Sequence, residues 1–195
     1  MKETILIKNS FQKPDIFEEN KQSILNFPVE EAKSGNIVCS GFETVLFDKK
    51  MTHLIYCPIT VRGGYSVPET VKSLGGESFS QCRELTSIVL SPVLNSIGCL
   101  AFENCTGLTS ISIPATVKEI GYRVFSNCTG LKSIHVESKS HIPLRKDSQV
   151  FYNVRKDSCI LYVPRGSKND YQQASQWKEF ENIIENDNSV YFSNS

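Results

Sequence analysis

Cysteine and histidine carry the most reactive side chains in this sequence, and their spacing is the first guide to its chemistry. There are seven cysteines, an odd number, so a disulfide framework would leave at least one thiol unpaired. Three of them, Cys82, Cys105 and Cys128, recur every 23 residues. No CxxC or HxxxH spacing typical of metal sites is present. The pattern favours small buried thiols and predicts no metal site.

Cys99 and the histidines are the remaining candidates for catalysis. Cys99 lies outside the recurring positions and is expected near solvent, but no histidine or basic neighbour in the sequence would activate it. His53, His135 and His141 are scattered along the chain, and GxGxxG, P-loop, GxSxG and HExxH motifs are absent. We therefore predict no catalytic residue and no cofactor. The alternative is a hydrolase that uses His53 or Cys57.

The recurring cysteines belong to a repeat of 23 residues. Three blocks, residues 62–84, 85–107 and 108–130, align without gaps. Counted from Leu85 and Leu108 as zero, apolar residues return at offsets 3, 5, 9 and 12, glycine at 13, phenylalanine at 17 and cysteine at 20. A fixed period of about 20 to 30 residues is typical of a solenoid, in which each unit buries its apolar face against its neighbours.

The offsets also predict the structure of one unit. Apolar residues at offsets 3 and 5, such as Ile111 and Ile113, have the two-residue period of a short strand, and Pro114 ends it. We interpret the glycine at offset 13 as a turn. Phenylalanine and cysteine, three residues apart, predict a short helical turn that faces the core. Stacked units would form an α/β solenoid with a parallel sheet along one face.

Residues 85–130 resemble the BspA-type leucine-rich repeat, whose pattern LxxIxIPxxVxxIGxxAFxxC they match almost letter for letter. The segments VLFDKKMTHLIYCP and ILYVPRGSKNDYQQASQWKEFENI resemble the entry module and the usual ending of these proteins. The resemblance implies a short right-handed stack. It also implies adhesion or host-matrix binding by a bacterial surface protein.

These assignments divide the chain into three parts. Residues 1–23 are an N-terminal extension, residues 24–186 the solenoid and residues 187–195 a polar tail. Within the solenoid, residues 24–31 are predicted to form a first, atypical strand. Residues 42–58 predict a β-hairpin, which would be either a recognition finger or a cover for a sheet edge.

Residues 167–185 are predicted to close the C-terminal end of the stack. Apolar residues spaced three apart form one face of this segment, namely Tyr171, Ala174, Trp177, Phe180 and Ile183. Ser167 and Asp170 predict a capping box at its start. As an alternative for the end of the segment, Ile183 and Ile184 form a last strand.

Charge and hydropathy bear on the class of partner. Lys plus Arg and Asp plus Glu both number 21, so no overall field would attract nucleic acid or an anionic membrane. No run approaches the roughly 18 apolar residues of a membrane helix, and MKETILIKNSF lacks the apolar stretch of a signal peptide. We expect a monomer without membrane insertion. The resemblance favours the cell surface or secretion, and the cytoplasm is the alternative.

The surface remains as the place of function. In-register stacking would align outward strand residues at offset 4, namely Ser66, Val89, Ser112 and His135. Tyr122 and Arg123, at offsets 14 and 15, form a second patch that contains the residue types which dominate protein interfaces. We therefore predict a non-enzymatic protein-binding, adhesion or scaffold module, with an extracellular-matrix or host surface protein as the partner. A purely structural spacer is a further alternative.

Overall fold

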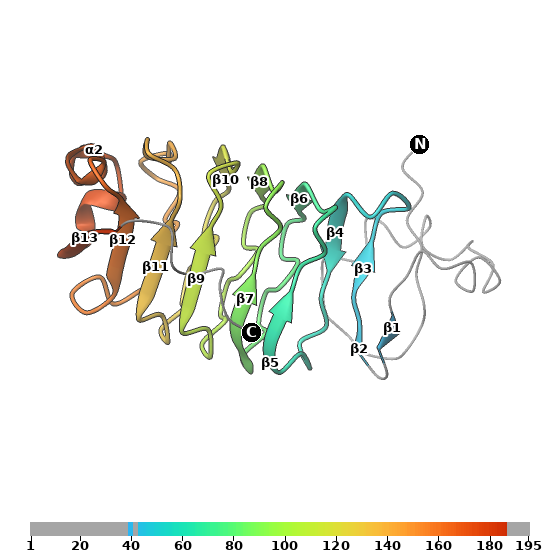
Figure 1. The fold of residues 1–195 in the computed structure, drawn as a ribbon. Coiled ribbons are helices and arrows are strands. Elements are labelled where there is room, and N and C mark those ends of the chain that lie inside the picture. The colour runs from blue at the N-terminus through green and yellow to red at the C-terminus, as the bar shows by residue number, and fades with distance from the viewer. Residues whose placement is uncertain (1–38, 41–42, 187–195) are drawn as a thin grey trace.

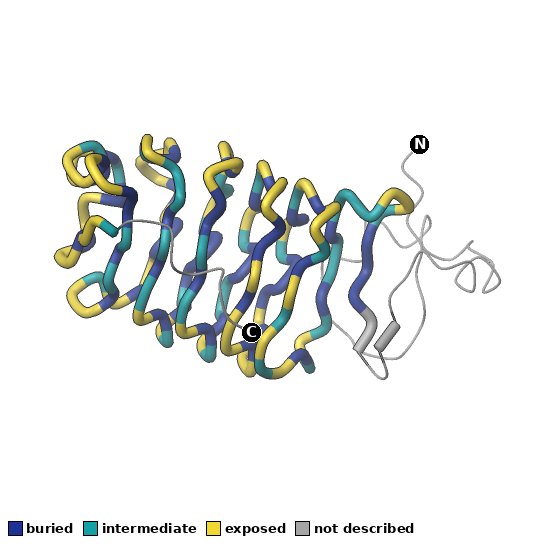
Figure 2. The backbone as a smooth tube through the Cα atoms, viewed as in Figure 1, coloured by how far each residue is buried: buried dark blue, intermediate teal, exposed yellow. Residues whose placement is uncertain are grey.

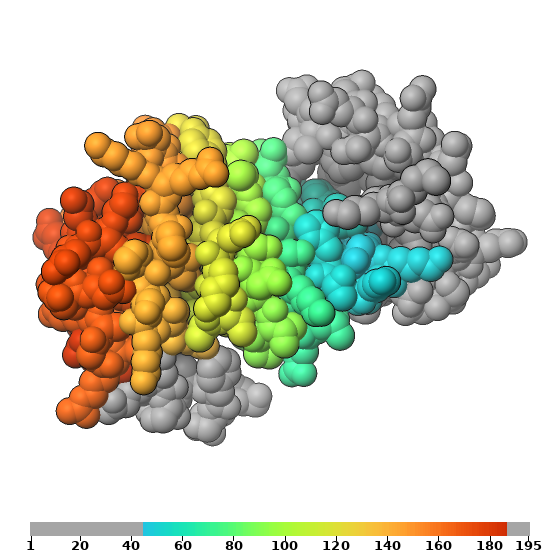
Figure 3. Space-filling view, turned by 90° about the horizontal axis from the view of Figure 1, so that it is seen from above, coloured from blue at the N-terminus to red at the C-terminus, as the bar shows by residue number. Residues whose placement is uncertain are grey.

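The 23-residue period sets the geometry of the fold, because each period returns the chain to the same place one strand further along the molecule. The computed structural model describes residues 39–40 and 43–186, which form an elongated stack of turns (Figure 1). The turns follow one another as successive bands along the long axis (Figure 3). The molecule is thus a leucine-rich-repeat solenoid. The predictions for residues 1–23, 24–31 and 187–195 lie outside the described residues.

The first arm of each turn contributes a strand to a six-stranded parallel sheet. Its strands, in spatial order, are β5 (Gly63–Ser66), β7 (Leu85–Val89), β9 (Ser110–Ile113), β11 (Ser133–Val136), β12 (Ile160–Pro164) and β13 (Asn182–Asn186). Equal offsets face each other, so Ile111 pairs with both Ile88 and Ile134. In β5, β9 and β11, less and more exposed residues alternate strictly (Figure 2), as the pleat requires.

The second arm forms a narrower sheet that the sequence did not reveal. Its strands, in spatial order, are β10 (Glu119–Ile120), β8 (Ser96–Ile97), β6 (Ser73–Leu74), β4 (His53–Tyr56) and β3 (Leu46–Phe47). β3 runs antiparallel to β4 and ends this sheet, whereas the other neighbours are parallel. A separate antiparallel pair joins β1 (Cys39–Ser40) to β2 (Glu43–Thr44). Because β3 continues the sheet, the geometry favours the edge-covering interpretation of the hairpin over a projecting finger.

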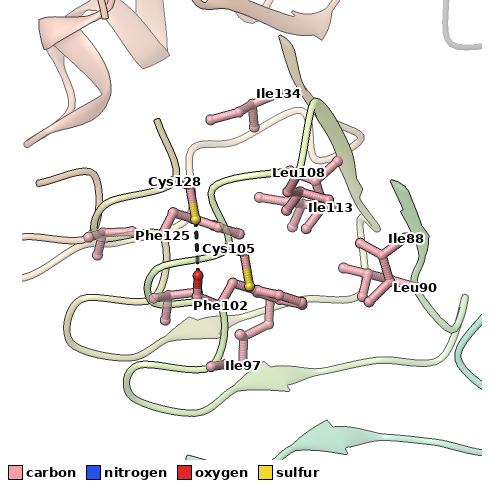
Figure 4. Close-up of a cluster of buried hydrophobic side chains, with 14 of the residues drawn as sticks. Ile88, Leu90, Ile97, Phe102, Cys105, Leu108, Ile113, Phe125, Cys128 and Ile134 are labelled. Atoms are coloured by element: carbon pink, nitrogen blue, oxygen red, sulfur yellow. Dashed lines mark hydrogen bonds between the residues drawn. The ribbon is translucent and has the colours of Figure 1, made fainter. Parts of the chain in front are cut away.

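A column of stacked phenylalanine rings runs through the core. The ring centroids of Phe79, Phe102, Phe125 and Phe151 are successively 5.2, 5.6 and 5.8 Å apart, and adjacent rings are nearly parallel. Beside this column, the fully buried Cys128 donates a hydrogen bond of 3.0 Å from Sγ to the Phe102 carbonyl oxygen (Figure 4). Cys105 makes the same bond to Phe79. The recurring thiols therefore satisfy backbone carbonyls of the preceding turn.

The predicted helical turn at offsets 17 to 20 is wrong. The third arm is a run of turns in which the residues at offsets 15 and 19 have positive φ, as Leu100 (61°) and Asn104 (60°) do. An α-helix needs negative φ at every residue, so it cannot form here. The arm instead bonds to the next turn, for example from Phe102 N to Val124 O at 2.9 Å. None of these positions is glycine, and only the asparagine at offset 19 signalled the left-handed backbone in the sequence.

The glycine at offset 13 allows the backbones of adjacent turns to approach each other closely. It is not required by a positive φ. A Cβ on Gly98 would lie 2.6 Å from the carbonyl carbon of Gly75, and a Cβ on Gly121 would lie 2.6 Å from Cys99 N. Neither Gly98 nor Gly121 has a positive φ. The repeat requires glycine here because adjacent backbones leave no room for a side chain.

Asparagines at offset 19 of two repeats, together with Asn153 in the longer turn that follows, form a hydrogen-bonded ladder across the turns. Asn153 Nδ2 donates to Asn127 Oδ1 at 3.1 Å, and Asn127 Nδ2 donates to Asn104 Oδ1 at 3.0 Å. All three residues have φ close to 60°. Asparagine tolerates the left-handed region better than most residues, so the ladder combines a permitted backbone with paired side-chain amides.

The C-terminal end is closed by α2 (Lys168–Gln173), η2 (Trp177–Glu179) and β13. Trp177 is fully buried and Phe180 nearly so, and their ring centroids lie 4.9 and 5.0 Å from that of Phe151. Trp177 Nε1 also donates to Ile142 O at 2.8 Å. Together these rings extend the phenylalanine column and cover its end.

Two details of this closing segment differ from the first interpretation. The capping box is wrong, because Ser167 makes no side-chain cap bond and donates instead to Pro164 O. Asp170 accepts from the backbone N–H of His141 at 2.6 Å, and this bond lowers the pKa of its carboxyl. Ile183 lies in β13, so the alternative of a last strand describes the end of the segment.

Candidate functional site

The four outward residues predicted at offset 4 lie on neighbouring strands of the six-stranded sheet. Ser66 pairs with Val89, and His135 pairs with Ser112. Val89 and Ser112 directly follow the paired residues Ile88 and Ile111, which joins the two pairs into one row. Val89 is 54% exposed and Ser66 is exposed, whereas Ser112 and His135 are partly buried.

This row continues over β12 and β13, two strands that follow the last 23-residue repeat and do not keep its spacing. His135 pairs with Tyr162, and Tyr162 pairs with Ile184, which is 43% exposed. Sequence reasoning missed both residues because Tyr162 follows His135 by 27 positions (162 − 135). The inward pattern of Leu161 and Val163 could have found Tyr162. We call Ser66, Val89, Ser112, His135, Tyr162 and Ile184 the sheet-face row.

The later part of the sheet-face row is aromatic. The rings of His135 and Tyr162 stack in parallel, with centroids 4.4 Å apart and planes 7° apart. Partial burial lowers the pKa of His135, so the neutral ring predominates at about pH 7. Earlier in the row, Ser112 Oγ donates to Glu137 Oε1 at 3.0 Å. The row therefore changes from the small side chains of Ser66, Val89 and Ser112 to an uncharged aromatic stack at His135 and Tyr162.

Tyr122 and Arg123 belong to a cluster on the third arm of two successive turns. The Arg123 guanidinium carbon lies 5.3 Å from the ring centroid of Tyr122 and 5.4 Å from that of Tyr152. Arg123 Nε donates to Gln149 Oε1 at 2.9 Å. Sequence reasoning missed Gln149 and Tyr152 because they lie in the longer turn that follows residue 130. We call Tyr122, Arg123, Gln149 and Tyr152 the lateral cluster.

The residues of the hydrolase alternative occupy different environments. His53 Nδ1 is 2.6 Å from Ser73 Oγ on the adjacent strand, which is the hydrogen bond of a nucleophile and its base. A triad also needs a group that orients the histidine ring. The carboxylate of Asp48 accepts the backbone N–H of His53. Cys57 is fully buried in the hydrophobic core.

Two of the buried thiols, Cys128 and Cys159, are poor nucleophiles and poor metal ligands. Burial raises the pKa of Cys128 to about 12 and that of Cys159 to about 11, so both remain protonated near neutral pH. Cys99 is exposed, as expected from its offset. In residues 39–40 and 43–186, no three His, Cys, Asp or Glu side chains are grouped to hold a metal ion. None of the helices in the same part of the chain is long and apolar enough to cross a membrane.

Comparison with known families accounts for the repeat. A model of the BspA type leucine-rich repeat region, in six copies, matches residues 63–161, which is 99 of 195 residues. The chain belongs to the BspA-type leucine-rich repeat family. The match includes the whole lateral cluster. Tyr162 and Ile184, at the end of the sheet-face row, follow the matched residues, and the β3–β4 hairpin precedes them.

Two solved structures resemble this BspA-type solenoid. A leucine-rich repeat protein from Eubacterium ventriosum is 28% identical, with a TM-score of 0.51, over 66% of this chain and 33% of its own. The pneumococcal vaccine antigen PcpA is 22% identical, with a TM-score of 0.45, over 73% of this chain and 46% of its own. The BspA-type chain thus spans about a third of the first protein and under half of the second. No curated protein matches it.

Proposed function

We propose that this BspA-type chain is a non-enzymatic protein-binding module that contacts its partner through the sheet-face row. The observation that carries the proposal is the stacked pair His135 and Tyr162, which stands in register with the exposed side chains of Val89 and Ile184. Stacked and well-packed aromatic side chains are the usual anchors of protein interfaces. The face of a solenoid offers such anchors a long, rigid support.

The family supports a scaffold of this kind and leaves the partner open. Leucine-rich repeat solenoids are generally binding modules rather than enzymes, and fold alone does not fix a ligand. Following the family resemblance, we propose an extracellular-matrix or host surface protein as the partner and adhesion as the role. The balanced charge of the chain, 21 basic and 21 acidic residues, agrees with a protein rather than a polyanion.

Binding to immobilised fibronectin, laminin and collagen, measured by surface plasmon resonance, tests the proposal. Wild-type protein should bind one of them saturably, and Tyr162→Ala should weaken that binding by about tenfold or more if Tyr162 is an anchor. Val93→Ser is the matched control, because Val93 is an exposed apolar residue (45%) outside both the sheet-face row and the lateral cluster. Melting temperatures establish that both variants are folded.

Two outcomes would contradict the proposal. Absence of saturable binding to these matrix proteins and to intact host cells would favour the structural spacer. Turnover in a parallel esterase and peptidase panel, abolished by both His53→Ala and Ser73→Ala, would favour a hydrolase. Ser73 is included because its hydroxyl contacts the His53 ring.

A further inference from the structure

The lateral cluster arises where two successive turns place their third arms side by side. Arg123 and Gln149 are equivalent residues of these turns, since both have positive φ, 51° and 50°. The arms are joined by backbone bonds from Arg123 N to Ser148 O and from Asn127 N to Tyr152 O, both 2.8 Å. The unusual backbone is thus shared by four successive turns, in which the paired residues are 77 and 81, 100 and 104, 123 and 127, and 149 and 153. The side chains that it carries here are specific to this junction.

Three neighbours hold the Arg123 guanidinium in place. Gln149 Oε1 accepts from Nε at 2.9 Å, and the rings of Tyr122 and Tyr152 lie at 5.3 and 5.4 Å from the guanidinium carbon. The Tyr122 hydroxyl also reaches Gln149 Oε1, at 3.5 Å. A flexible side chain is thereby fixed in advance, which reduces the conformational entropy lost when a ligand binds.

The charge of Arg123 is not compensated by an acid in the described part of the chain. Arg62 pairs with Glu84 at 3.1 Å, and Arg155 pairs with Asp157 at 3.8 Å, but Arg123 has no such ion pair there. Among the described residues, its Nη atoms likewise make no hydrogen bond, since Gln149 is bonded to Nε. Four N–H groups of a fixed, planar cation therefore remain for a ligand.

The chemistry of the cluster selects a single carboxylate beside apolar groups. A guanidinium binds a carboxylate through two parallel hydrogen bonds. Tyr122 and Tyr152 are 42% and 52% exposed and provide apolar area next to it. A nucleic acid or another polyanion would instead require several cations, and in the preceding turns the equivalent pairs are Gly76 with Glu77 and Cys99 with Leu100.

We propose that the lateral cluster binds an aspartate or glutamate side chain of a protein partner, with apolar neighbours of that residue packed on Tyr122 and Tyr152. This inference rests on the proposed protein-binding function but uses a different face from the sheet-face row. Gln149 is a positioning residue, because it orients the guanidinium through Nε. The partner would present its acidic residue on an exposed loop or extended segment.

Side-chain NMR of the arginine Nε–H groups tests the proposal. The probes are the capped peptides acetyl-Leu-Glu-Leu-amide and acetyl-Leu-Gln-Leu-amide, titrated at constant ionic strength. The glutamate peptide should shift the Arg123 signal saturably, with an affinity about fivefold or more above that of the glutamine peptide, because a charge-assisted bidentate pair is lost in the latter. Equal affinities, or no shift of the Arg123 signal, would overturn the proposal.

Two variants and a second anion distinguish a specific carboxylate site at Arg123 from non-specific binding of anions to exposed basic side chains. With the glutamate peptide, measured by isothermal titration calorimetry because the Arg123 signal is lost, Arg123→Lys should weaken binding about fivefold, since lysine keeps the charge and loses the planar fork. Arg83→Lys, on an exposed arginine without an ion pair among the described residues, is the control and should change nothing. Inorganic phosphate that shifts Arg123 at equal or lower concentration would overturn the carboxylate assignment.

The two proposals fail separately. Peptide binding at Arg123 without saturable matrix binding would contradict the proposed function and leave the carboxylate site standing. Matrix binding that depends on Tyr162, together with a silent Arg123 signal, would overturn only the carboxylate site.

Discussion

In the three regular repeats, the outward sheet face carries Gly64, serines and one exposed valine, whereas the turns after residue 130 place His135, Tyr162 and Ile184 on the same face. The interior shows a related contrast. Residues 62–130 supply one phenylalanine per turn, and the later turns add Phe151, Trp177 and Phe180 around the end of the column. The regular repeats therefore form the body of the solenoid. The irregular turns after residue 130 close its C-terminal end and place aromatic side chains on the outward sheet face.

The third arm shows the same division. Glu77 and Leu100 occupy the offset at which Arg123 stands, and the guanidinium contacts Gln149 and Tyr152 because the next turn carries different side chains at its equivalent positions. A strictly repeated sequence would place identical side chains on every turn. Binding specificity in such a rod has to come from positions where the turns differ.

Removing the closing segment should have the largest effect. A chain that ends after Gly166 lacks α2, η2 and β13, and so exposes Phe151 and an edge of β12. We expect a loss of more than about 5 kcal/mol, since three buried aromatic side chains, Tyr171, Trp177 and Phe180, are removed together, and aggregation through the open end. Size-exclusion chromatography with light scattering and thermal unfolding measure both effects.

Trp177 reports on the same closure in the intact protein. Its indole is fully buried, so its fluorescence should be blue-shifted and poorly quenched by iodide. A fully quenchable Trp177, together with a truncated chain that stays monomeric and melts at the same temperature, would contradict the capping role.

Within the regular repeats, Phe102→Ala should cost about 3 to 5 kcal/mol. Phe102 is fully buried between Phe79 and Phe125, at 5.2 and 5.6 Å, and the stacked turns hinder collapse of the cavity. Phe180→Ala, at the end of the column, should fall near the lower limit. Denaturant unfolding measures both, and a loss below about 1 kcal/mol for Phe102 would refute the column as a stabilising feature.

Gln176→Ala should cost about 2 to 3 kcal/mol, because it leaves buried groups without partners. Gln176 Nε2 donates to Arg145 O and Ser148 Oγ, at 2.6 and 2.7 Å, and Oε1 accepts from Val150 N at 2.8 Å. The control is Gln173→Ala in α2, an exposed amide that donates to Asn169 Oδ1. Equal unfolding free energies for the two variants would show that the bonds of Gln176 add nothing.

Substitutions in the asparagine ladder should have a smaller effect on stability. They separate the contribution of the left-handed backbone from that of the side-chain hydrogen bonds. Asn127→Ala should cost about 1 to 2 kcal/mol, from the left-handed backbone and the lost amide bonds. Asn127→Gly loses the same bonds without backbone strain, and should be more stable than the alanine variant by about 0.5 to 1 kcal/mol. Urea unfolding compares them, and an alanine variant as stable as the glycine variant would argue against strain at φ 58°.

Ser112→Ala should have the smallest effect, less than about 0.5 kcal/mol. The residue lies on the outward sheet face, and its hydroxyl makes one partly exposed bond to Glu137. Thermal and denaturant unfolding should match wild type. A larger loss of stability would mean that the small residues on the sheet face of the regular repeats also stabilise the solenoid. The contrast between the regular repeats and the turns after residue 130 would then be weaker.

Much of the solenoid could be predicted because each unit packs against a copy of itself. Ile88, Ile111 and Ile134 lie in register in the six-stranded sheet, as equal offsets require. The helical turn at offsets 17 to 20 was mispredicted, since three-residue spacing suits a helix and a tight series of turns equally well. The positive φ at Leu100 leaves no mark in residue type, and the asparagine at position 104, which tolerates positive φ, was the signal that the sequence interpretation passed over.

Only some residues of the sheet-face row and the lateral cluster could be predicted from the sequence. Ser66, Val89, Ser112 and His135 follow from the period, and so do Tyr122 and Arg123 as neighbours. Tyr162, Gln149 and Tyr152 follow turns of a different length, so no fixed offset connects them to their partners. The capping box at Ser167 failed because Asp170 is bonded to His141, from a distant loop.

The amino-acid sequence by itself determined the repeat, the family, the buried ladders of isoleucine, phenylalanine and cysteine, and the absence of a strong overall charge. These features depend on the spacing of residues along the chain. Because the turns stack in register, residues at equal offsets lie next to one another in the structure. Tertiary structure alone decided the second sheet, the left-handed arms and the lateral cluster. Each depends on contacts between turns, where backbone hydrogen bonds and side-chain packing outweigh local preference, and these contacts are set by the length and shape of the neighbouring turn.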